Sequence, residues 1–242
     1  MTAATTPAPA AVVAIETATE TVGVAVRTAA GLEAELVVTG RRRHVESLTP
    51  ALEHLLAQVE LAPADLGVVA VDIGPGLFTG LRVGVAAAKG LAQSLGIGVL
   101  GATSLDILAA GAAEAGHHGL VLSCVDARRG EVFALVRDLD AGAERVAPGL
   151  FTPDELAAVL GRLEGAQIRA VGDGAQRYGA LLGEVPGVEV VAPALAFPSP
   201  SVLLHGALAR LEGGEAPVDA ASVVPLYMRD ADAKINFARA RA

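Results

Sequence analysis

The residues whose types could support chemistry surround a Gly-Pro-Gly turn. Asp72 ends a short apolar run that begins at Val68, and Gly74-Pro75-Gly76 follows directly. A glycine-rich turn between a strand and a helix can hold phosphate with backbone N–H groups, and a carboxylate beside it could serve as a general base. The Gly-Lys-Ser/Thr of a Walker A loop does not follow. A tight turn that lets the next helix pack closely explains the same residues without any ligand.

A helix must position this turn. From Gly80 to about Gly96 the pattern is helical, and Thr79 is the expected N-cap. Few polar residues occur in this helix, so we expect it to be covered on more than one side. We treat the turn and the start of the helix as one signature loop, which consists of Gly74, Pro75, Gly76, Thr79, Gly80 and Arg82.

Composition limits the classes of function. The chain has 242 residues, of which 52% are hydrophobic and 19% charged, so it can bury a core in one large domain or two small ones. A formal net charge of −9 argues against nucleic-acid binding by this chain alone through a broad basic face. The single cysteine, Cys124, excludes an internal disulfide and fits a reducing, cytoplasmic location. No apolar run approaches the ~18 residues of a membrane span, so we predict no membrane association.

The order of predicted elements repeats once along the chain. The first half has strands at 12–15, 21–27 and 32–38, a helix from 44 to 59, a strand at 68–72, the helix at 80–96 and a short strand at 98–100. The second half has strands at 120–126, 131–137 and 145–150, a helix from the capping box at 152–155 to about 163, a strand at 167–171, a weaker helix at 174–182, an edge strand at 188–191 and a last helix at 200–211. Both halves begin β-β-β-α-β-α. This order predicts an α/β fold of the actin/sugar-kinase/Hsp70-like (ASKHA) class with two ribonuclease-H-like halves.

The predicted domain boundaries follow from this repeat. Residues 1–10 are expected to be a disordered tail, because they lack the basic and apolar regions of a signal peptide. Residues 11–103 form the N-terminal ribonuclease-H-like half, which the segment 220–242 could join. Residues 104–219 form the C-terminal half, and the hinge is expected near residues 103–119.

Residues 72–92 also carry a family signature. The stretch DIGPGLFTGLRVGVAAAKGLA resembles the GPGSFTGLRIGxxxAKGLA signature of the bacterial TsaB (YeaZ) proteins, with Leu77 where that family usually has serine. Glu16 stands where the family usually has aspartate. The other matches occur in the family's order over most of the chain: VVAIETATE at 12–20, RRRHVESLTPAL at 41–52, GATSLDILA at 101–109, DARRGEVFALV at 126–136 and PLYMRDADAK at 225–234.

The resemblance implies a role in making threonylcarbamoyladenosine (t6A) at position 37 of tRNA. In that family TsaB is the non-catalytic partner of the related transferase TsaD, and the ATPase TsaE joins the complex. We therefore expect a heterodimer with a TsaD-like protein and a homodimer when the chain is alone. We expect contact with tRNA only through the complex.

The resemblance also bears on metal and nucleotide sites. The catalytic relative has His-x-x-x-His where this chain has Ser104 and Leu108, and leucine cannot bind a metal. Nucleotide sites of this fold class use glycine-rich hairpins, whereas the first hairpin here, at 16–20, has two acids and no glycine. The second hairpin carries Arg128 and Arg129 where close backbone approach is needed. We therefore predict no catalytic residue, no metal ligand and no cofactor, although Gly172-Asp173-Gly174 could line an adenosine pocket or form a strand-to-helix turn.

Two helices carry apolar rows that predict a partner interface. Paired with two helices of a related protein, the helices at 44–59 and 80–96 would form a four-helix contact. The predicted interface residues are Val45, Leu48, Leu52, Leu55, Val59, Leu81, Gly84, Val85, Ala88 and Ala92. The alternative is that Gly84 faces its own sheet, in which case a larger residue there would unfold the chain.

Two interpretations remain for the rest of the surface and for the class of protein. The basic clusters, which are Arg41, Arg42 and Arg43 and then Arg128 and Arg129, form either a solvated face or a patch that contributes to tRNA binding once a partner supplies the rest. The alternative function is a small-molecule kinase or ATPase of the same fold with Asp72 as its base. That function would require hairpins able to bind phosphate.

Overall fold

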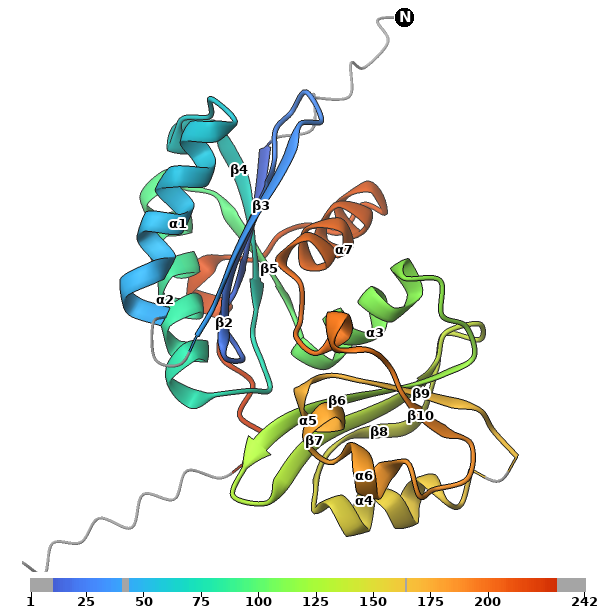
Figure 1. Cartoon of the computed structure of the whole chain (residues 1–242). Coiled ribbons are helices and arrows are strands. Elements are labelled where there is room, and N and C mark those ends of the chain that lie inside the picture. The colour runs from blue at the N-terminus through green and yellow to red at the C-terminus, as the bar shows by residue number, and fades with distance from the viewer. Residues whose placement is uncertain (1–10, 41–43, 164, 230–242) are drawn as a thin grey trace, which may run out of the picture.

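Two five-stranded sheets form the two lobes of the chain (Figure 1). The structure is a computed structural model, and it describes residues 11–40, 44–163 and 165–229. The predicted tail at 1–10, the arginines at 41–43 and the segment 230–242 therefore lie outside the described residues.

The first sheet has the strand order β3-β2-β1-β4-β5. Its strands are β1 (Ala11–Glu16), β2 (Thr21–Arg27), β3 (Glu33–Thr39), β4 (Leu66–Asp72) and β5 (Gly98–Ala102). The first three are antiparallel neighbours, and β4 and β5 run parallel to β1. The helices α1 (His44–Gln58) and α2 (Phe78–Leu95) cover one face, and the 3-10 turn η1 (Pro63–Asp65) precedes β4.

The second sheet repeats this arrangement with the order β10-β9-β6-β7-β8. Its strands are β6 (Leu120–Arg128), β7 (Glu131–Asp138), β8 (Ala143–Phe151), β9 (Ile168–Val171) and β10 (Val188–Val190). One face is covered by α4 (Pro153–Leu160), α5 (Asp173–Arg177) and α6 (Gly179–Leu182), and η2 (Pro193–Leu195) follows β10. The central strand of each sheet is antiparallel to the next strand in sequence and parallel to the fourth. The predicted ASKHA-type fold with two ribonuclease-H-like halves is confirmed.

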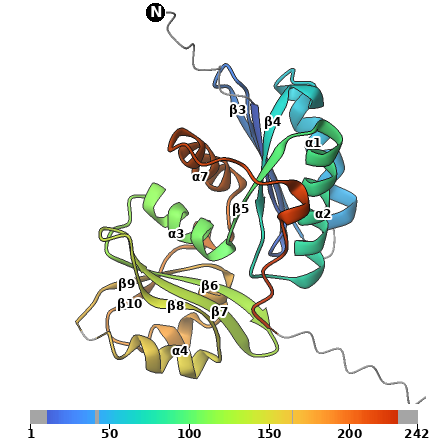
Figure 2. The same ribbon diagram turned by 180° about the vertical axis from the view of Figure 1, so that it is seen from behind.

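Two helices lie between the sheets (Figures 1 and 2). The helix α3 (Ser104–Glu114) follows β5 of the first sheet but packs on the second, with Leu105 and Leu108 against β6 and β7. The helix α7 (Pro200–Glu212) follows the second sheet but packs on β1, β2 and β4 of the first. The predicted half at 104–219 therefore includes one helix, α7, that packs on the first sheet. The predicted hinge at 103–119 is largely α3, because its apolar side chains are needed to cover the second sheet.

The first residues of α4 and α2 test the helix caps that the sequence predicted. Thr152 accepts a bond from the Glu155 N–H and the Glu155 carboxylate accepts one from the Thr152 N–H, so the predicted capping box opens α4. The predicted N-cap Thr79 is wrong: α2 begins at Phe78, and its N-cap residue Leu77 makes no side-chain cap bond. Leu77 is held instead by its own N–H, which donates to the Ala18 carbonyl at 2.6 Å. Within the described residues, no helix has the length and apolarity to cross a bilayer.

The last described residues cross from one lobe to the other, and we call residues 223–229 the C-terminal strap. The preceding turn, η3 (Ala220–Ser222), packs on α2, and the Lys89 ammonium donates to the Val223 carbonyl at 2.8 Å. Met228 packs on the apolar cluster between α3 and the second sheet. The Arg229 guanidinium donates to the Ala127 carbonyl at 3.1 Å and pairs with Glu131. The strap thus fixes the spacing of the lobes at one side.

Candidate functional site at the junction of the lobes

Three signature glycines let the first hairpin pack onto the start of α2. A Cβ atom added at Gly76, Gly80 or Gly84 would come closer than 3.0 Å to the Ala18 carbonyl, the Thr17 carbonyl or the Thr17 hydroxyl respectively. The Thr17 hydroxyl donates to the Gly80 carbonyl at 2.8 Å, and the His44 ring Nε2 donates to the Thr19 carbonyl at 2.8 Å. The hairpin between β1 and β2 is therefore bonded to both α2 and α1.

These contacts correct the predicted partner interface. Gly84 faces Thr17 of its own chain, so the alternative stated for Gly84 is the one the structure supports. The predicted residues that are buried in the chain's own core are Leu48, Leu55, Val59, Leu81, Gly84, Val85, Ala88 and Ala92, and Leu52 is partly buried beside them. Val45 alone is well exposed, at 70%. The apolar rows of these two helices face the chain's own core. Spacing alone could not show this, because a helix that covers a sheet and a helix that meets a partner have the same apolar spacing.

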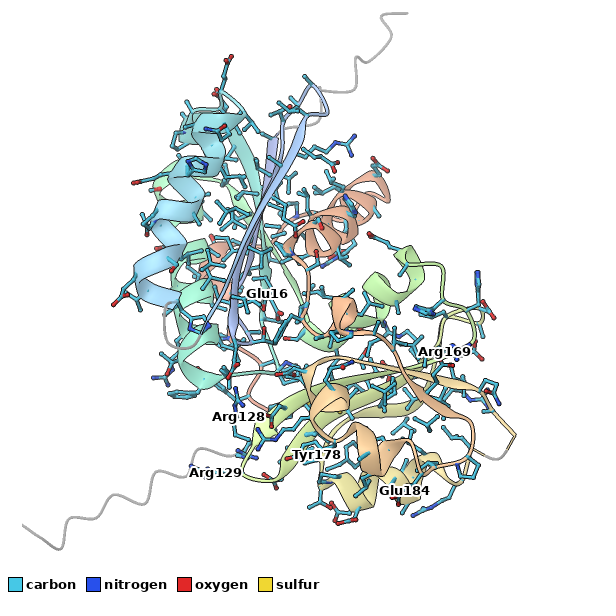
Figure 3. All side chains as sticks on the ribbon, viewed as in Figure 1. Glu16, Arg128, Arg129, Arg169, Tyr178 and Glu184 are labelled. Carbon is cyan, nitrogen blue, oxygen red and sulfur yellow. The ribbon has the colours of Figure 1, made fainter. Side chains whose placement is uncertain are left out.

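A pair of carboxylates lies at the carboxyl ends of β1 and β4. Glu16 is fully buried, and it accepts bonds from the Ala18 N–H at 2.7 Å and the Thr21 hydroxyl at 2.8 Å. Asp72 is also fully buried, and its Oδ1 accepts from the Gly74 N–H at 2.7 Å and the Ser104 hydroxyl at 2.8 Å. Its Oδ2 has no partner. Figure 3 shows Glu16 at the end of the first sheet that faces the other lobe.

Burial decides the protonation of this pair. Burial, and then the charge of Asp72, hold the pKa of Glu16 well above its usual range. Burial raises the pKa of Asp72 to about 7, against the lowering effect of its bonds from Gly74 and Ser104. An orphaned, solvent-free oxygen fits a carboxyl group that carries a proton. Asp72 therefore lacks the exposure that a general base requires.

The second lobe carries a matching pair with a different environment. Asp126 near the end of β6 is 3% exposed and accepts from the Arg128 guanidinium at 2.8 Å and the Arg177 guanidinium at 3.0 Å. Asp173 accepts from the Asp126 N–H at 2.9 Å. Burial raises the pKa of Asp173 to about 6. The second pair thus differs from the first in that Asp126 forms ion pairs with two guanidiniums.

An ion pair joins the β1–β2 hairpin to the β6–β7 hairpin across the gap between them, which we call the mouth. The Arg128 guanidinium lies 2.5 Å from the Glu20 carboxylate across the lobe junction, and it also binds Asp126 of its own hairpin. Arg128 and Arg129 both adopt positive φ, 64° and 56°, which turns the chain tightly between β6 and β7. An open groove of about 880 Å³ lies outside this pair, lined by Glu20, His44, Val45, Leu77, Phe78, Thr79, Gly80 and Arg128. The predicted tRNA residue Arg128 is therefore committed to acids of its own chain, which weakens that prediction for Arg128.

The remaining predicted positions have structural contacts. Ser104 binds Asp72, and Leu108 is buried under the second sheet. A Cβ added at Gly172 or Gly174 would come closer than 3.0 Å to Cys124, so this turn serves close packing on β6. No group of three His, Cys, Asp or Glu side chains suited to a metal occurs in the part of the chain that the structure describes. Burial raises the pKa of the Cys124 thiol far above its usual range, which makes it a poor nucleophile.

One exposed group was missed by the sequence analysis. Phe78 and Tyr227 are 50% and 45% exposed, and the guanidinium of Arg82 in the signature loop lies over the Phe78 ring, beside the contact between the two rings. No periodicity connects positions 78 and 227, and the only signal was that each falls in a stretch that resembles the same family.

The fold and the site together define a class: a two-lobed α/β protein of the ASKHA type whose first hairpin packs on α2 and whose two hairpins are joined by an ion pair. The family model described as TsaD, tRNA N6-adenosine threonylcarbamoyltransferase, matches residues 38–237. The solved structure of YeaZ from Pseudomonas aeruginosa superposes with a TM-score of 0.78 at 27% identity, over 90% of this chain and 100% of that chain. The chain belongs to the TsaB (YeaZ) branch of this family.

The sequence relatives match this chain at similar identity but over different shares of its length. The tRNA threonylcarbamoyladenosine biosynthesis protein TsaB of Bacillus subtilis is 39% identical over 50% of this chain and 52% of its own length. The protein of the same name in Escherichia coli is 32% identical over 62% of each chain. An uncharacterized protein of Mycobacterium tuberculosis is 36% identical over 92% of this chain and 93% of its own. The chain thus spans about half to three fifths of these two named relatives and nearly all of the uncharacterized one.

Proposed function

We propose that the chain is a non-catalytic subunit of the cytoplasmic apparatus that makes t6A on tRNA, and that it binds and activates a TsaD-like transferase with a TsaE-like ATPase. Membership of the TsaB branch supports the pathway, because the relatives' printed names place them in t6A biosynthesis. The observation that carries the non-catalytic role is the closed junction: the first hairpin is bonded to α2, and Arg128 pairs with Glu20 across the mouth.

The contacts of Asp72 weigh against the kinase or ATPase alternative. A base in phosphoryl transfer must reach the attacking hydroxyl within hydrogen-bond distance. Asp72 is fully buried and its bonds go to Gly74 and Ser104. Opening a path to it would require separating the hairpin from three glycines that permit no side chain.

The partner interface is proposed on the outer face of the same two helices. The described residues that are exposed there include Val45 and Glu53 on α1 and Arg82, Ala86 and Gly90 on α2. Ala86 and Gly90 have little side chain, so a partner helix can approach α2 closely. We expect the free chain to self-associate through this face, and we expect tRNA to bind only to the complex.

A reconstituted reaction tests the function. tRNA, a threonylcarbamoyl donor, a TsaE-like ATPase with ATP and the TsaD-like transferase of the same organism are incubated with and without this chain, and t6A is measured by mass spectrometry of the digested tRNA. The product should form only when both the transferase and this chain are present. Asp72→Asn should stimulate as well as the wild type, because Asp72 is fully buried and its bonds go to Gly74 and Ser104. Product from this chain alone, or full product without it, would contradict the proposal, and ATP turnover lost in Asp72→Asn would favour the kinase.

A further inference from the structure

Two aromatic rings and a guanidinium form a stack on the surface beside the groove. The Arg82 guanidinium carbon lies 3.8 Å from the Phe78 ring centroid and 5.9 Å from that of Tyr227. The two ring centroids are 5.4 Å apart, and the Arg82 Nε donates to the Tyr227 hydroxyl at 3.0 Å. Because these contacts join the start of α2 to the C-terminal strap, all three side chains are held in place before any partner arrives.

The exposure of this stack is unusual for this chain. Only seven residues of the sequence are phenylalanine or tyrosine. Among the described residues, Phe78 and Tyr227 are the exposed aromatic rings. Val45 lines the same groove as Phe78, and Val224 and Leu226 on the strap are also exposed. A rigid aromatic and arginine group inside an apolar patch is typical of residues that dominate a protein–protein interface.

The charge of Arg82 indicates what the partner carries. Arg82 pairs with no acidic side chain in the described residues, whereas Arg128 and Arg229 next to the groove pair with Glu20 and Glu131. A guanidinium held over an aromatic ring still has its terminal N–H groups available for a carboxylate. Nucleic acid is disfavoured because Glu20 lines the same groove and the chain carries a net charge of −9.

From these contacts we infer that Phe78, Arg82 and Tyr227 anchor the protein partner, which places a carboxylate against Arg82 and apolar side chains against the two rings. The inference rests on the proposed function and specifies where on the α2 face the partner is held. The carboxylate accepts from the free N–H groups of Arg82, and the partner's apolar side chains cover the exposed faces of Phe78 and Tyr227. Small residues farther along α2 then contribute fit, while this stack contributes most of the affinity.

Titration calorimetry with the TsaD-like transferase of the same organism tests the inference. Arg82→Glu and Phe78→Ala should each weaken binding by roughly 30-fold or more, the size expected of an interface anchor. Arg82→Met keeps the side-chain stem against Phe78 and removes only the charge, so it should weaken binding by roughly tenfold and serves if Arg82→Glu fails to fold. Tyr227→Phe removes the internal hydrogen bond and keeps the rings and the charge, so it should bind within about threefold of the wild type. Arg162→Glu makes the same charge change at an exposed site on the second lobe and should also have little effect.

The outcomes separate this inference from the proposed function. Equal affinity of wild type, Arg82→Glu and Phe78→Ala for the transferase would overturn the anchor and leave the proposed function standing. A wild-type chain that does not bind the transferase would overturn both. Thermal unfolding of each variant identifies loss of folding. If Arg82→Glu instead weakens binding of tRNA alone, or self-association measured by sedimentation, while transferase binding is unchanged, the stack serves another occupant and the inference is wrong.

Discussion

The two lobes place a carboxylate pair at matching points of their sheets, but only the pair in the second lobe has guanidinium partners among the described residues. In the first lobe, Glu16 and Asp72 are fully buried, and Asp72 has an oxygen without a partner. In the second lobe, Asp126 is bonded to Arg128 and Arg177, whose side chains are both partly exposed. Burial raises the pKa of Glu16 and Asp72, whereas Asp126 forms ion pairs with two guanidiniums. The comparison teaches that carboxyl groups at the junction can have a structural role in either environment, and their presence alone does not indicate catalysis.

The packing of the first-lobe pair depends on glycine, and the largest effect is expected there. Gly84→Leu should unfold the chain, and Gly84→Ala should cost at least ~1–3 kcal/mol, because the added Cβ would collide with the Thr17 hydroxyl. Gly90→Ala, on the exposed side of the same helix with nothing within 4 Å, should be neutral or stabilise by ~0.5–1 kcal/mol. Chemical denaturation of the three variants checks this. A folded Gly84→Leu chain of wild-type stability would show that Gly84 does not face the hairpin.

Replacing Asp126 or Asp72 by asparagine should change the free energy of unfolding in opposite directions. At pH 8, Asp126→Asn should destabilise by ~1.5–3 kcal/mol, because two guanidiniums lose a charged acceptor. Asp72→Asn should be stabilising, because pH 8 lies above the folded pKa of about 7 and the amide removes the charge that the buried acid carries there. Urea unfolding curves of both variants measure the difference. Equal destabilisation by the two changes would remove the contrast between the lobes.

The pH dependence of stability should sharpen the same contrast. Asp72 has a folded pKa of about 7 against an ordinary value of 3.8, so the folded state binds the extra proton between these values. Its stabilising contribution is therefore complete below about pH 4 and is lost as the pH rises through about 7. Glu16 shifts in the same direction. The wild type should lose a few kcal/mol between pH 5 and 8, and Glu16→Gln/Asp72→Asn should lose less.

The control for this slope lies in the second lobe. Asp173, with a pKa raised to about 6, should supply the slope that remains in the double variant, and Asp173→Asn should reduce it further. Stability is measured by urea unfolding at each pH. A double variant with the slope of the wild type would show that the first-lobe pair is charged in the folded state.

The smallest effect is expected at the ion pair across the mouth. Arg128 and Glu20 are 34% and 26% exposed, so solvent screens their attraction. Their coupling energy in a double-mutant cycle with Glu20→Gln and Arg128→Gln should be no more than ~1 kcal/mol. Arg128→Gln alone should cost more than Glu20→Gln, because it also removes a partner of Asp126. Equal single effects would mean that the bond to Asp126 contributes little to stability.

Local patterns in the sequence determined much of this protein. Alternating and helical periodicities gave the doubled β-β-β-α-β-α order, since each element must bury one face whatever its neighbour. The capping box at Thr152 and Glu155 gave the start of α4, because both partners lie within one helical turn. The signature at 72–92 gave the family, since close packing on Thr17 and Ala18 leaves only glycine at three of its positions.

Other features depended on contacts between distant residues. The apolar row of α2 could face a sheet or a partner. The first hairpin decides that Gly84 faces inward, and it is held on α2 by the bond from Thr17 to Gly80, which joins positions 63 residues apart. Likewise, α3 and α7 each cover the sheet of the other lobe, which element order cannot reveal. The pairing of Arg128 with Glu20 joins positions 108 residues apart, and that of Arg82 with Tyr227 joins positions 145 apart. Tertiary structure alone brings such pairs together, because side-chain type fixes what a residue can bind but not which residue it meets.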